Sequence, residues 1–354
     1  MYEFRGSAFE QVDSALPACY TDFINFGLDR SLVVVGDMPQ VIGQIGSTNF
    51  AVVGLGLHGN QIGSVRQQVH DGDTLVVRAE GNFGVRMLGI DAAEISFSLP
   101  GSSTFTPIHK PEWVEFLGNP FASRWKPFDP PLPNSLKASL RARCKPNTAA
   151  NHAIHAQKAQ QALEAMILAD MEALQQDKQT FRFFIVFCNE VMDRYGRFLG
   201  FINRFQEREN IERPLSYNDR LVRQAIVTPY FIWPNINPFR KAAPHKAVIP
   251  PFQAPQKADE DKLLREARLA IRQARKQKIG IFDPAEPLKL LPFELRFLAR
   301  RQPPDRWVID LGKQDDILIR PENYYTIQNI EDRLFIPQEY VPLFVEQGWR
   351  KQVS

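Results

Sequence analysis

Three apolar stretches separated by two tight-turn signals constrain the fold of this chain more than any other feature of its sequence. The dipeptides Asp71-Gly72 and Gly81-Asn82 are typical of turns that join antiparallel strands. The stretches on either side are rich in Val, Leu and Ile, as strands are. We therefore expect a β-meander, with strands at Ile62–Val69, Leu75–Ala79 and Phe83–Ile90.

Downstream of the meander, the pattern changes to helix, then strand, then helix again. Thr148–Gln176 places apolar residues three and four positions apart, which predicts a long helix. Phe181–Cys188 and Phe198–Ile202 flank the turn Tyr195-Gly196 and predict a hairpin. Two more helices are expected, at Asn218–Ile226 and Asp259–Lys278. The second is very basic, and its charged residues are interpreted mainly as a solvated face.

Two long stretches lie outside this core pattern. Residues 95–147 carry Pro, Trp and Phe without a period, so we expect an irregular insertion there. Residues 286–354 predict a hairpin, from Trp307–Leu311 and Ile317–Arg320, and a short helix at Tyr340–Gln347. No chemistry is evident in this last stretch, which is interpreted as a small α/β extension.

The composition narrows the class of protein. Hydrophobic residues make up 44% of the 354 residues, which excludes a globally disordered chain. The net charge of +3 gives no strongly basic field, and the three cysteines lack the CxxC spacing of a zinc site. No apolar run approaches the roughly 20 residues of a membrane helix. Acidic residues interrupt the N-terminus where a signal peptide would lie, so a cytoplasmic protein is expected.

Polar residues within the meander point to chemistry. Asp73 lies in the first turn, Arg86 lies in the third strand, and Asp91 and Glu94 end that strand. Because antiparallel neighbours share an end, Asp73 and Asp91 are expected to lie close together. Neighbouring carboxylates repel one another unless a cation separates them, and hard oxygen ligands favour Ca²⁺ or Mg²⁺. Zinc has little support without HExxH, and His152 and His155 are interpreted as surface or first-turn residues of their helix.

A phosphodiester substrate fits these groups. Arg86 would bind a phosphate oxygen and stabilise the charge that grows during in-line attack, and Glu94 would orient or deprotonate water. The segment Asp193–Arg197 offers a second guanidinium from a tight turn, at Arg197, with Tyr195 exposed beside it.

Five segments in order resemble the thermonuclease family, that is, staphylococcal nuclease-like proteins. The segments are HDGDTLVV (70–77), VRMLGIDAAE (85–94), DRYGRFLGFI (193–202), NDRLVRQAIVTPYFIWPN (218–235) and KQKIGIFD (276–283). The resemblance implies an α+β fold, a five-stranded OB-like β-barrel with packed helices. It predicts three parts: an N-terminal β-rich extension (1–61), the nuclease-like domain (62–285) with the insertion 95–147, and the C-terminal α/β extension (286–354).

The resemblance also implies roles for individual residues. The implied metal ligands are Asp73, Asp91 and the backbone carbonyl of Ala92; the implied catalytic residues are Arg86, Glu94 and Arg197; and the implied substrate-binding residues are Arg194, Tyr195 and Tyr230. The chain departs from the family at Ala93, where Pro is common, and at Ile232, where some members have an aromatic residue.

The expected function is therefore a Ca²⁺-dependent nuclease that cuts within single-stranded DNA or RNA with little sequence specificity. In the family the 5′ oxygen leaves and 3′-phosphate ends result. The alternative is a non-catalytic module that binds nucleic acid or protein on the same barrel. A further alternative is an enzyme whose site the insertion 95–147 covers.

Overall fold

The structure is a computed structural model of the whole chain. It describes residues 41–45, 48–51, 53–71, 74–75, 77–79, 81–193, 195–206, 212–237 and 244–353. The chain forms two compact units, residues 1–83 and 84–354, and each is described by itself. These units do not follow the expected boundaries at 61/62 and 285/286, and the three expected domains stay predictions.

The first unit is built from short strand pairs. The pairs are β1 (Ile42–Ile45) with β2 (Thr48–Ala51), β3 (Val53–Leu55) with β8 (Val77–Ala79), β4 (Leu57–His58) with β5 (Gln61–Ile62), and β6 (Val69–Asp71) with β7 (Thr74–Leu75). The turn expected after residue 71 is confirmed, because Asp71 lies opposite Thr74.

The strand predicted at Ile62–Val69 is wrong in its middle, where helix α2 (Val65–Gln68) forms. Ser64 precedes this helix and Gln67 follows three positions later. The Ser64 backbone N–H and hydroxyl both donate to the Gln67 side-chain oxygen, at 2.9 and 3.1 Å. This spacing resembles a capping box, and it starts a helix locally within a sequence that otherwise looks like a strand.

The second unit holds a three-stranded sheet in the order β13 (Phe183–Met192), β14 (Phe198–Arg204), β9 (Val85–Met87). The predicted hairpin is confirmed by the antiparallel β13–β14 pair, and β9 joins it in parallel beside β14. Gly200 permits this close packing, because a Cβ there would lie 2.7 Å from a methyl carbon of Ile185.

A four-stranded sheet in the order β10 (Gly89–Asp91), β15 (Thr228–Ile232), β18 (Arg333–Ile336), β16 (Trp307–Asp310) joins the two ends of the unit. The C-terminal stretch therefore shares a sheet with the strand that ends in Asp91. The hairpin predicted within that stretch is reduced to one bridge, Val308–Ile319. β16 pairs along its length with β18 instead, and β17 (Ile317–Leu318) pairs with β19 (Arg350–Lys351).

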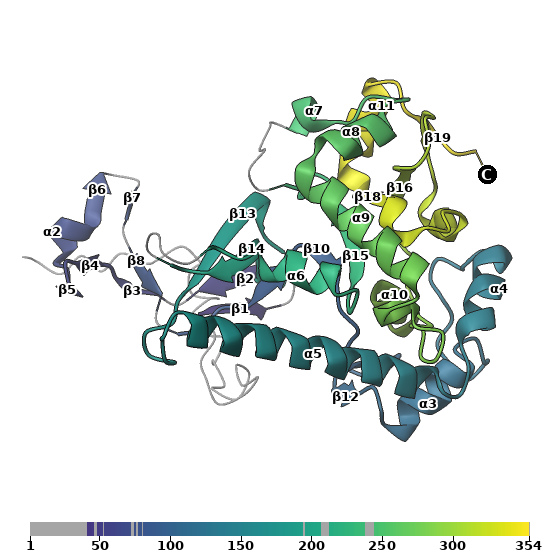
Figure 1. Cartoon of the computed structure of the whole chain (residues 1–354), viewed down its shortest axis with the longest axis horizontal. Coiled ribbons are helices and arrows are strands. Elements are labelled where there is room, and N and C mark those ends of the chain that lie inside the picture. The colour runs from purple at the N-terminus through teal and green to yellow at the C-terminus, as the bar shows by residue number, and fades with distance from the viewer. Residues whose placement is uncertain are drawn as a thin grey trace, which may run out of the picture. The chain divides into compact units, whose positions relative to one another are not determined.

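Helices form in the three segments where the sequence predicts them (Figure 1). They are α5 (Thr148–Ala173), α6 (Tyr217–Arg223) and α9 (Lys262–Gln277), with α8 (Ala254–Glu260) before α9. α5 packs against α3 (Pro111–Gly118) and α6. The basic helix α9 is more than a solvated face, because Arg268 is 5% exposed and binds Asp332 at 2.8 Å.

The insertion 95–147 was expected to be irregular, but parts of it form regular elements. It contains β11 (Ser96–Ser98), β12 (Phe105–Pro107), α3 and α4 (Asn134–Arg143). Trp113 and Phe116 of α3 are fully buried in a core that also holds Tyr230 and Phe335. The two helices span only 8 and 10 residues, and prolines separate them, so the repeat of apolar positions is too short to recognise in the sequence.

The remaining elements are short and lie mainly in the C-terminal stretch. They are α7 (Pro244–Ala247), η2 (Gly280–Phe282), α10 (Pro292–Arg300), η3 (Pro321–Thr326), η4 (Ile330–Asp332), η5 (Gln338–Tyr340) and α11 (Val341–Glu346). α11 confirms the helix expected at Tyr340–Gln347.

The α+β fold class is confirmed by this mixture of helices and short sheets. Among the described residues no closed barrel is found, so the barrel stays a prediction. None of the described helices has both the length and the apolar character needed to cross a membrane.

Candidate functional site

Asp91, predicted as a metal ligand, lies at the end of β10 with its side chain completely buried. Arg86 of β9 donates to one carboxylate oxygen at 2.5 Å. Arg296 of α10 donates to both oxygens, at 2.9 Å each. Thr228 of β15 fixes the backbone at the same point, because its hydroxyl donates to the Asp91 carbonyl oxygen at 2.9 Å. The Asp91 carboxylate is therefore held by two guanidiniums.

Glu94, predicted as the water-activating carboxylate, follows β10 and remains partly accessible, with 23% of its side chain exposed. Arg296 also donates to Glu94, at 2.7 Å from Oε1. One guanidinium thus bridges the two carboxylates. We call Arg86, Asp91, Glu94 and Arg296 the acid–arginine cluster.

Opposing effects act on the buried charges of this cluster. Burial alone would raise the pKa of Asp91, but the charges of Arg296 and Arg86 outweigh it and hold the pKa below its ordinary value. Burial works against the charge of Arg296 as well, yet Asp91 and Glu94 raise the pKa of Arg296. Asp91 is therefore an anion and Arg296 a cation at neutral pH, and the formal charges of the four residues in the cluster sum to zero.

His152 was predicted to be a surface or first-turn residue of its helix. It is the fifth residue of α5 and is fully buried next to the acid–arginine cluster. Its Nε2 accepts a hydrogen bond from the Glu94 backbone N–H at 2.8 Å. Burial lowers the pKa of His152 to about 3, although the charge of Asp91 opposes this. The ring is neutral at physiological pH, with its proton on Nδ1, and it positions the backbone of Glu94.

Local sequence signals start α10, the helix that carries Arg296. Pro292 opens the helix, and Glu294 accepts from the Leu291 backbone N–H at 2.8 Å, a helix-start arrangement. Glu294 is buried and is also bound by Arg143 of α4, at 2.5 and 2.8 Å. The first turn of α10 is thus fixed by a buried ion pair, and Arg296 projects from the second turn.

Arg197, the second predicted guanidinium, lies at an exposed turn. It binds Asp193 four residues earlier, at 2.7 Å, and 44% of its side chain is exposed. Its guanidinium carbon lies 5.5 Å from the ring centre of Tyr195, and that of Arg300, in the last turn of α10, lies 5.9 Å from the same ring. Tyr195 therefore connects the turn that carries Arg197 with the helix that carries Arg296.

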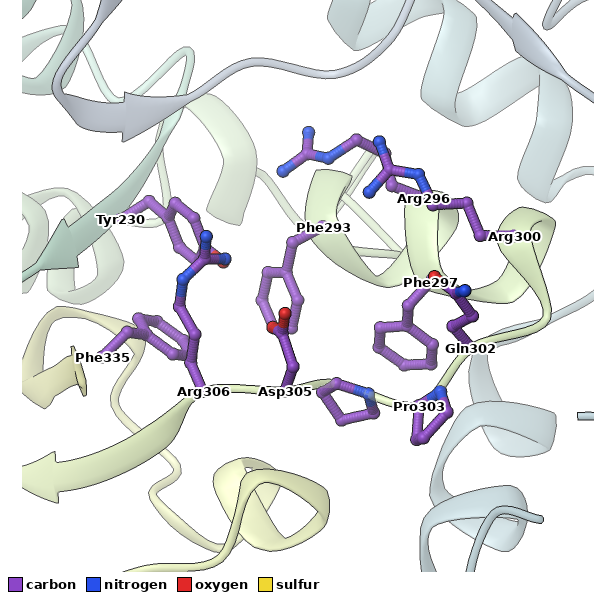
Figure 2. Close-up of a pocket in the computed structure, with 11 residues that line it drawn as sticks. Tyr230, Phe293, Arg296, Phe297, Arg300, Gln302, Pro303, Asp305, Arg306 and Phe335 are labelled. Atoms are coloured by element: carbon purple, nitrogen blue, oxygen red, sulfur yellow. The ribbon is translucent and has the colours of Figure 1, made fainter. Parts of the chain in front are cut away.

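A pocket of about 90 Å³ lies beside the cluster. Its lining combines aromatic rings, arginines and a loop: Tyr230, Phe293, Arg296, Phe297, Arg300, Gln302, Pro303, Pro304, Asp305, Arg306 and Phe335. Figure 2 shows Arg296 and Arg300 extending from α10 on one side and Arg306 beside Tyr230 on another. We call this the α10 pocket.

Tyr230, predicted to lie beside the substrate, lines this pocket but is 8% exposed. Its ring stacks on Phe293 at 5.4 Å, with 18° between the planes. Its hydroxyl accepts from Arg306 at 2.8 Å. The Nε of Arg306 is buried and has no hydrogen-bond partner among the described residues.

Three predicted residues remain. Asp73 and Arg194 lie outside the described residues. Ala92 directly follows Asp91, and its side chain packs against the apolar cluster that includes Ile90 and Met166.

The described acids do not fit a cation in their present arrangement. Both oxygens of Asp91 and one of Glu94 are taken by arginines. No cluster of three or more Asp, Glu, His or Cys side chains suited to a metal occurs in the part of the chain that the structure describes.

Sequence reasoning missed Arg296, Arg306 and the burial of His152. The signal for Arg296 was present in PFELRFLAR, where arginines four apart interrupt an otherwise apolar helix. An arginine surrounded by apolar residues needs a partner.

Comparisons with known proteins find no relative of this chain. No family model matches the chain, and neither a curated protein nor a solved structure matches it significantly.

Proposed function

We propose that this protein is a nuclease that hydrolyses phosphodiester bonds of DNA or RNA with little sequence specificity. The observation that carries the proposal is the acid–arginine cluster. Three residues predicted from one motif segment, Arg86, Asp91 and Glu94, meet there: Arg86 donates to Asp91, and the Arg296 guanidinium donates to both Asp91 and Glu94. The neighbouring α10 pocket adds cationic and aromatic groups, which suit phosphate and base.

Each group has a role in the proposed reaction. Glu94 is the carboxylate with solvent access, so it orients or deprotonates the attacking water. Arg86 and Arg197 bind non-bridging phosphate oxygens and stabilise the charge that grows as water attacks. Because arginine keeps its proton, neither guanidinium is the acid for the departing oxygen. Water supplies that proton.

The substrate is proposed to be single-stranded. Tyr195 is 42% exposed and carries Arg197 over its face, so it offers a stacking surface next to a phosphate-binding group. Arg194 and Tyr230 are the further substrate contacts that the family resemblance suggests. The OB-like barrel and a cytoplasmic location belong to the same proposal.

The proposed Ca²⁺ requirement comes from the family resemblance. Asp91 as described does not meet that requirement, because Arg296 occupies both of its carboxylate oxygens. The predicted ligands Asp73 and Ala92 are part of the same expectation.

End-labelled single-stranded DNA and RNA provide the test, with the protein incubated in Ca²⁺ and then in EDTA. Glu94→Gln and Arg197→Ala are compared with matched changes on exposed surface, Glu164→Gln on α5 and Arg124→Ala. We expect cleavage in Ca²⁺, its loss in EDTA and in the two site variants, and normal cleavage by both controls. Cleavage that is absent from the unaltered protein, or equal in all four variants, contradicts the proposal.

The complete burial of Asp91 favours a second candidate, a module that binds nucleic acid without cutting it. A buried carboxylate whose two oxygens are both held by guanidiniums is what a purely structural ion pair looks like. This candidate predicts retention of the labelled strands in a mobility-shift assay, with no products in Ca²⁺.

A further inference from the structure

We infer that the α10 pocket is a binding site for a phosphate monoester, the group found at a phosphorylated end of a nucleic acid strand. The strand as carrier of this phosphate rests on the proposed function, whereas the phosphate itself is argued from the pocket. Every lining residue except Tyr230 comes from the C-terminal stretch, beyond the five segments that carry the family resemblance.

Arg306 is the group in the pocket that lacks an anion. One of its terminal nitrogens donates to the neutral hydroxyl of Tyr230 at 2.8 Å. Within the described part of the chain, its Nε is buried without a hydrogen-bond partner and no carboxylate forms an ion pair with the guanidinium. A partly buried charge without a counter-ion costs free energy, and an anion in the pocket would supply the missing partner.

The charges of the lining favour an anion. The described lining carries three arginines and one acid, Asp305. Arg296 is already compensated by Asp91 and Glu94. The formal charges that remain are two positive and one negative, so the pocket attracts a ligand with one or two negative charges.

The placement of the donors suits a phosphate monoester better than an internal phosphodiester. Figure 2 shows Arg300 extending from α10 on one side and Arg306 beside Tyr230 on another, with Gln302 on the loop that follows the helix. A monoester offers these donors three non-ester oxygens and a charge of about −1.5 to −2 at pH 7, whereas an internal phosphodiester offers two oxygens and a single charge. The pocket volume of about 90 Å³ holds several water molecules, so it has room for a tetrahedral group.

Arg300 connects the pocket with the exposed turn that carries Arg197. Its guanidinium carbon lies 5.9 Å from the ring centre of Tyr195, on which a base of a single strand is proposed to stack. A strand held at this turn would therefore bring its end to the mouth of the pocket.

Fluorescence anisotropy in EDTA tests the inference without cleavage. The probes are labelled oligothymidines that carry either a phosphate or a hydroxyl at the unlabelled end, in a 5′ and a 3′ version. We expect one phosphate-ended version to bind about tenfold more tightly than its hydroxyl-ended counterpart, because charge-assisted hydrogen bonds are added.

Two variants assign this preference to the pocket. Arg306→Gln should remove it, and Arg300→Gln, at an exposed position, should reduce it. Arg124→Gln removes the same charge from exposed surface elsewhere and should keep the full preference. Circular dichroism establishes which variants are folded. Equal affinity for phosphate-ended and hydroxyl-ended strands in both versions overturns the inference, as does a full preference in whichever pocket variant folds.

Thymidine monophosphate as a competitor distinguishes the two carriers of the phosphate. Displacement at the concentration at which the phosphate-ended strand itself binds supports the site with a free nucleotide as its ligand, and weaker displacement supports a strand end. If phosphate-ended strands are preferred but no nucleic acid is cut, the inference stands and the proposed nuclease fails. Cleavage without any preference removes the inference alone.

Discussion

The acid–arginine cluster and the turn at Arg197 satisfy their charges in opposite ways. Asp193 neutralises Arg197 from four residues away, on a surface where 44% of the Arg197 side chain remains exposed. Asp91 is neutralised in the interior by Arg296, which lies 205 positions later in the chain. The exposed pair can open to receive a phosphate at little cost, whereas the buried pair holds its own acids closed. The pairing of Arg197 with Asp193 can therefore be predicted from neighbouring residues, whereas the pairing of Arg296 with Asp91 cannot.

Removing one partner from each pair gives the largest contrast. Asp91→Ala leaves Arg86 and Arg296 without their buried anion, so we expect a loss of about 3–5 kcal/mol in the free energy of unfolding. Asp193→Ala affects an exposed pair and should cost about 1 kcal/mol. Urea unfolding of both variants is the measurement. Equal losses would mean that the two regions do not differ in the way their charges are held.

Arg197→Ala sharpens the contrast from the functional side. We expect cleavage to fall by a factor on the order of 10²–10³, since one donor to the developing phosphate charge is lost. The free energy of unfolding should change by less than about 1 kcal/mol, because the pair is exposed. Cleavage rates and urea midpoints on the same preparation check both parts. Unchanged cleavage would remove this turn from the site.

The buried His152 should make the cluster sensitive to acid. The pKa of His152 is depressed to about 3 in the folded protein, from an ordinary 6.5, so its contribution to stability is present above pH 6.5 and is lost as the pH falls toward 3. Between pH 6.5 and 5 this amounts to about 2 kcal/mol. Unfolding free energies across that range should be flatter for His152→Gln. A slope that is identical in the two proteins would contradict the burial of a neutral ring.

The smallest expected effect concerns the exposed aromatic residue of the turn. Tyr195→Ala removes a stacking surface worth about 1 kcal/mol, which is roughly a fivefold weaker Kd for a short single strand. Fluorescence anisotropy with labelled oligothymidine in EDTA measures it. Tyr195→Phe is the control and should bind normally, whereas equal binding by Tyr195→Ala would exclude stacking at this ring.

The sequence was a good guide for several elements with local contacts, but the predicted β-meander is wrong in its pairing. The stretches 75–79 and 83–90 were expected to be neighbours, whereas β8 pairs with β3, β9 with β14 and β10 with β15. The period of α5, the turn at residue 71 and the hairpin of β13 with β14 all depend on near neighbours, and all are confirmed. The helix α2 within a predicted strand shows the limit, because one capping interaction reversed a weak preference.

The motif residues of the candidate site could be predicted from the sequence, but the occupation of the Asp91 carboxylate by Arg296 could not. Arg86, Asp91 and Glu94 lie on one short segment, so their proximity follows from the chain itself. The occupation of Asp91 by Arg296 depends on β15 pairing with β18 and on the buried Arg143–Glu294 pair that fixes α10. Neither contact has a signature within a sequence window, and this is why the C-terminal stretch seemed to lack chemistry.

The most direct test of the central claim is the rate of single-strand cleavage in Ca²⁺, measured for the unaltered protein and for Glu94→Gln. We expect the unaltered protein to cut and Glu94→Gln to cut slower by a factor of about 10² or more, because the carboxylate that positions the attacking water is lost. The absence of cleavage by the unaltered protein, or equal rates for the two proteins, would contradict the claim that the acid–arginine cluster is the site of a nuclease.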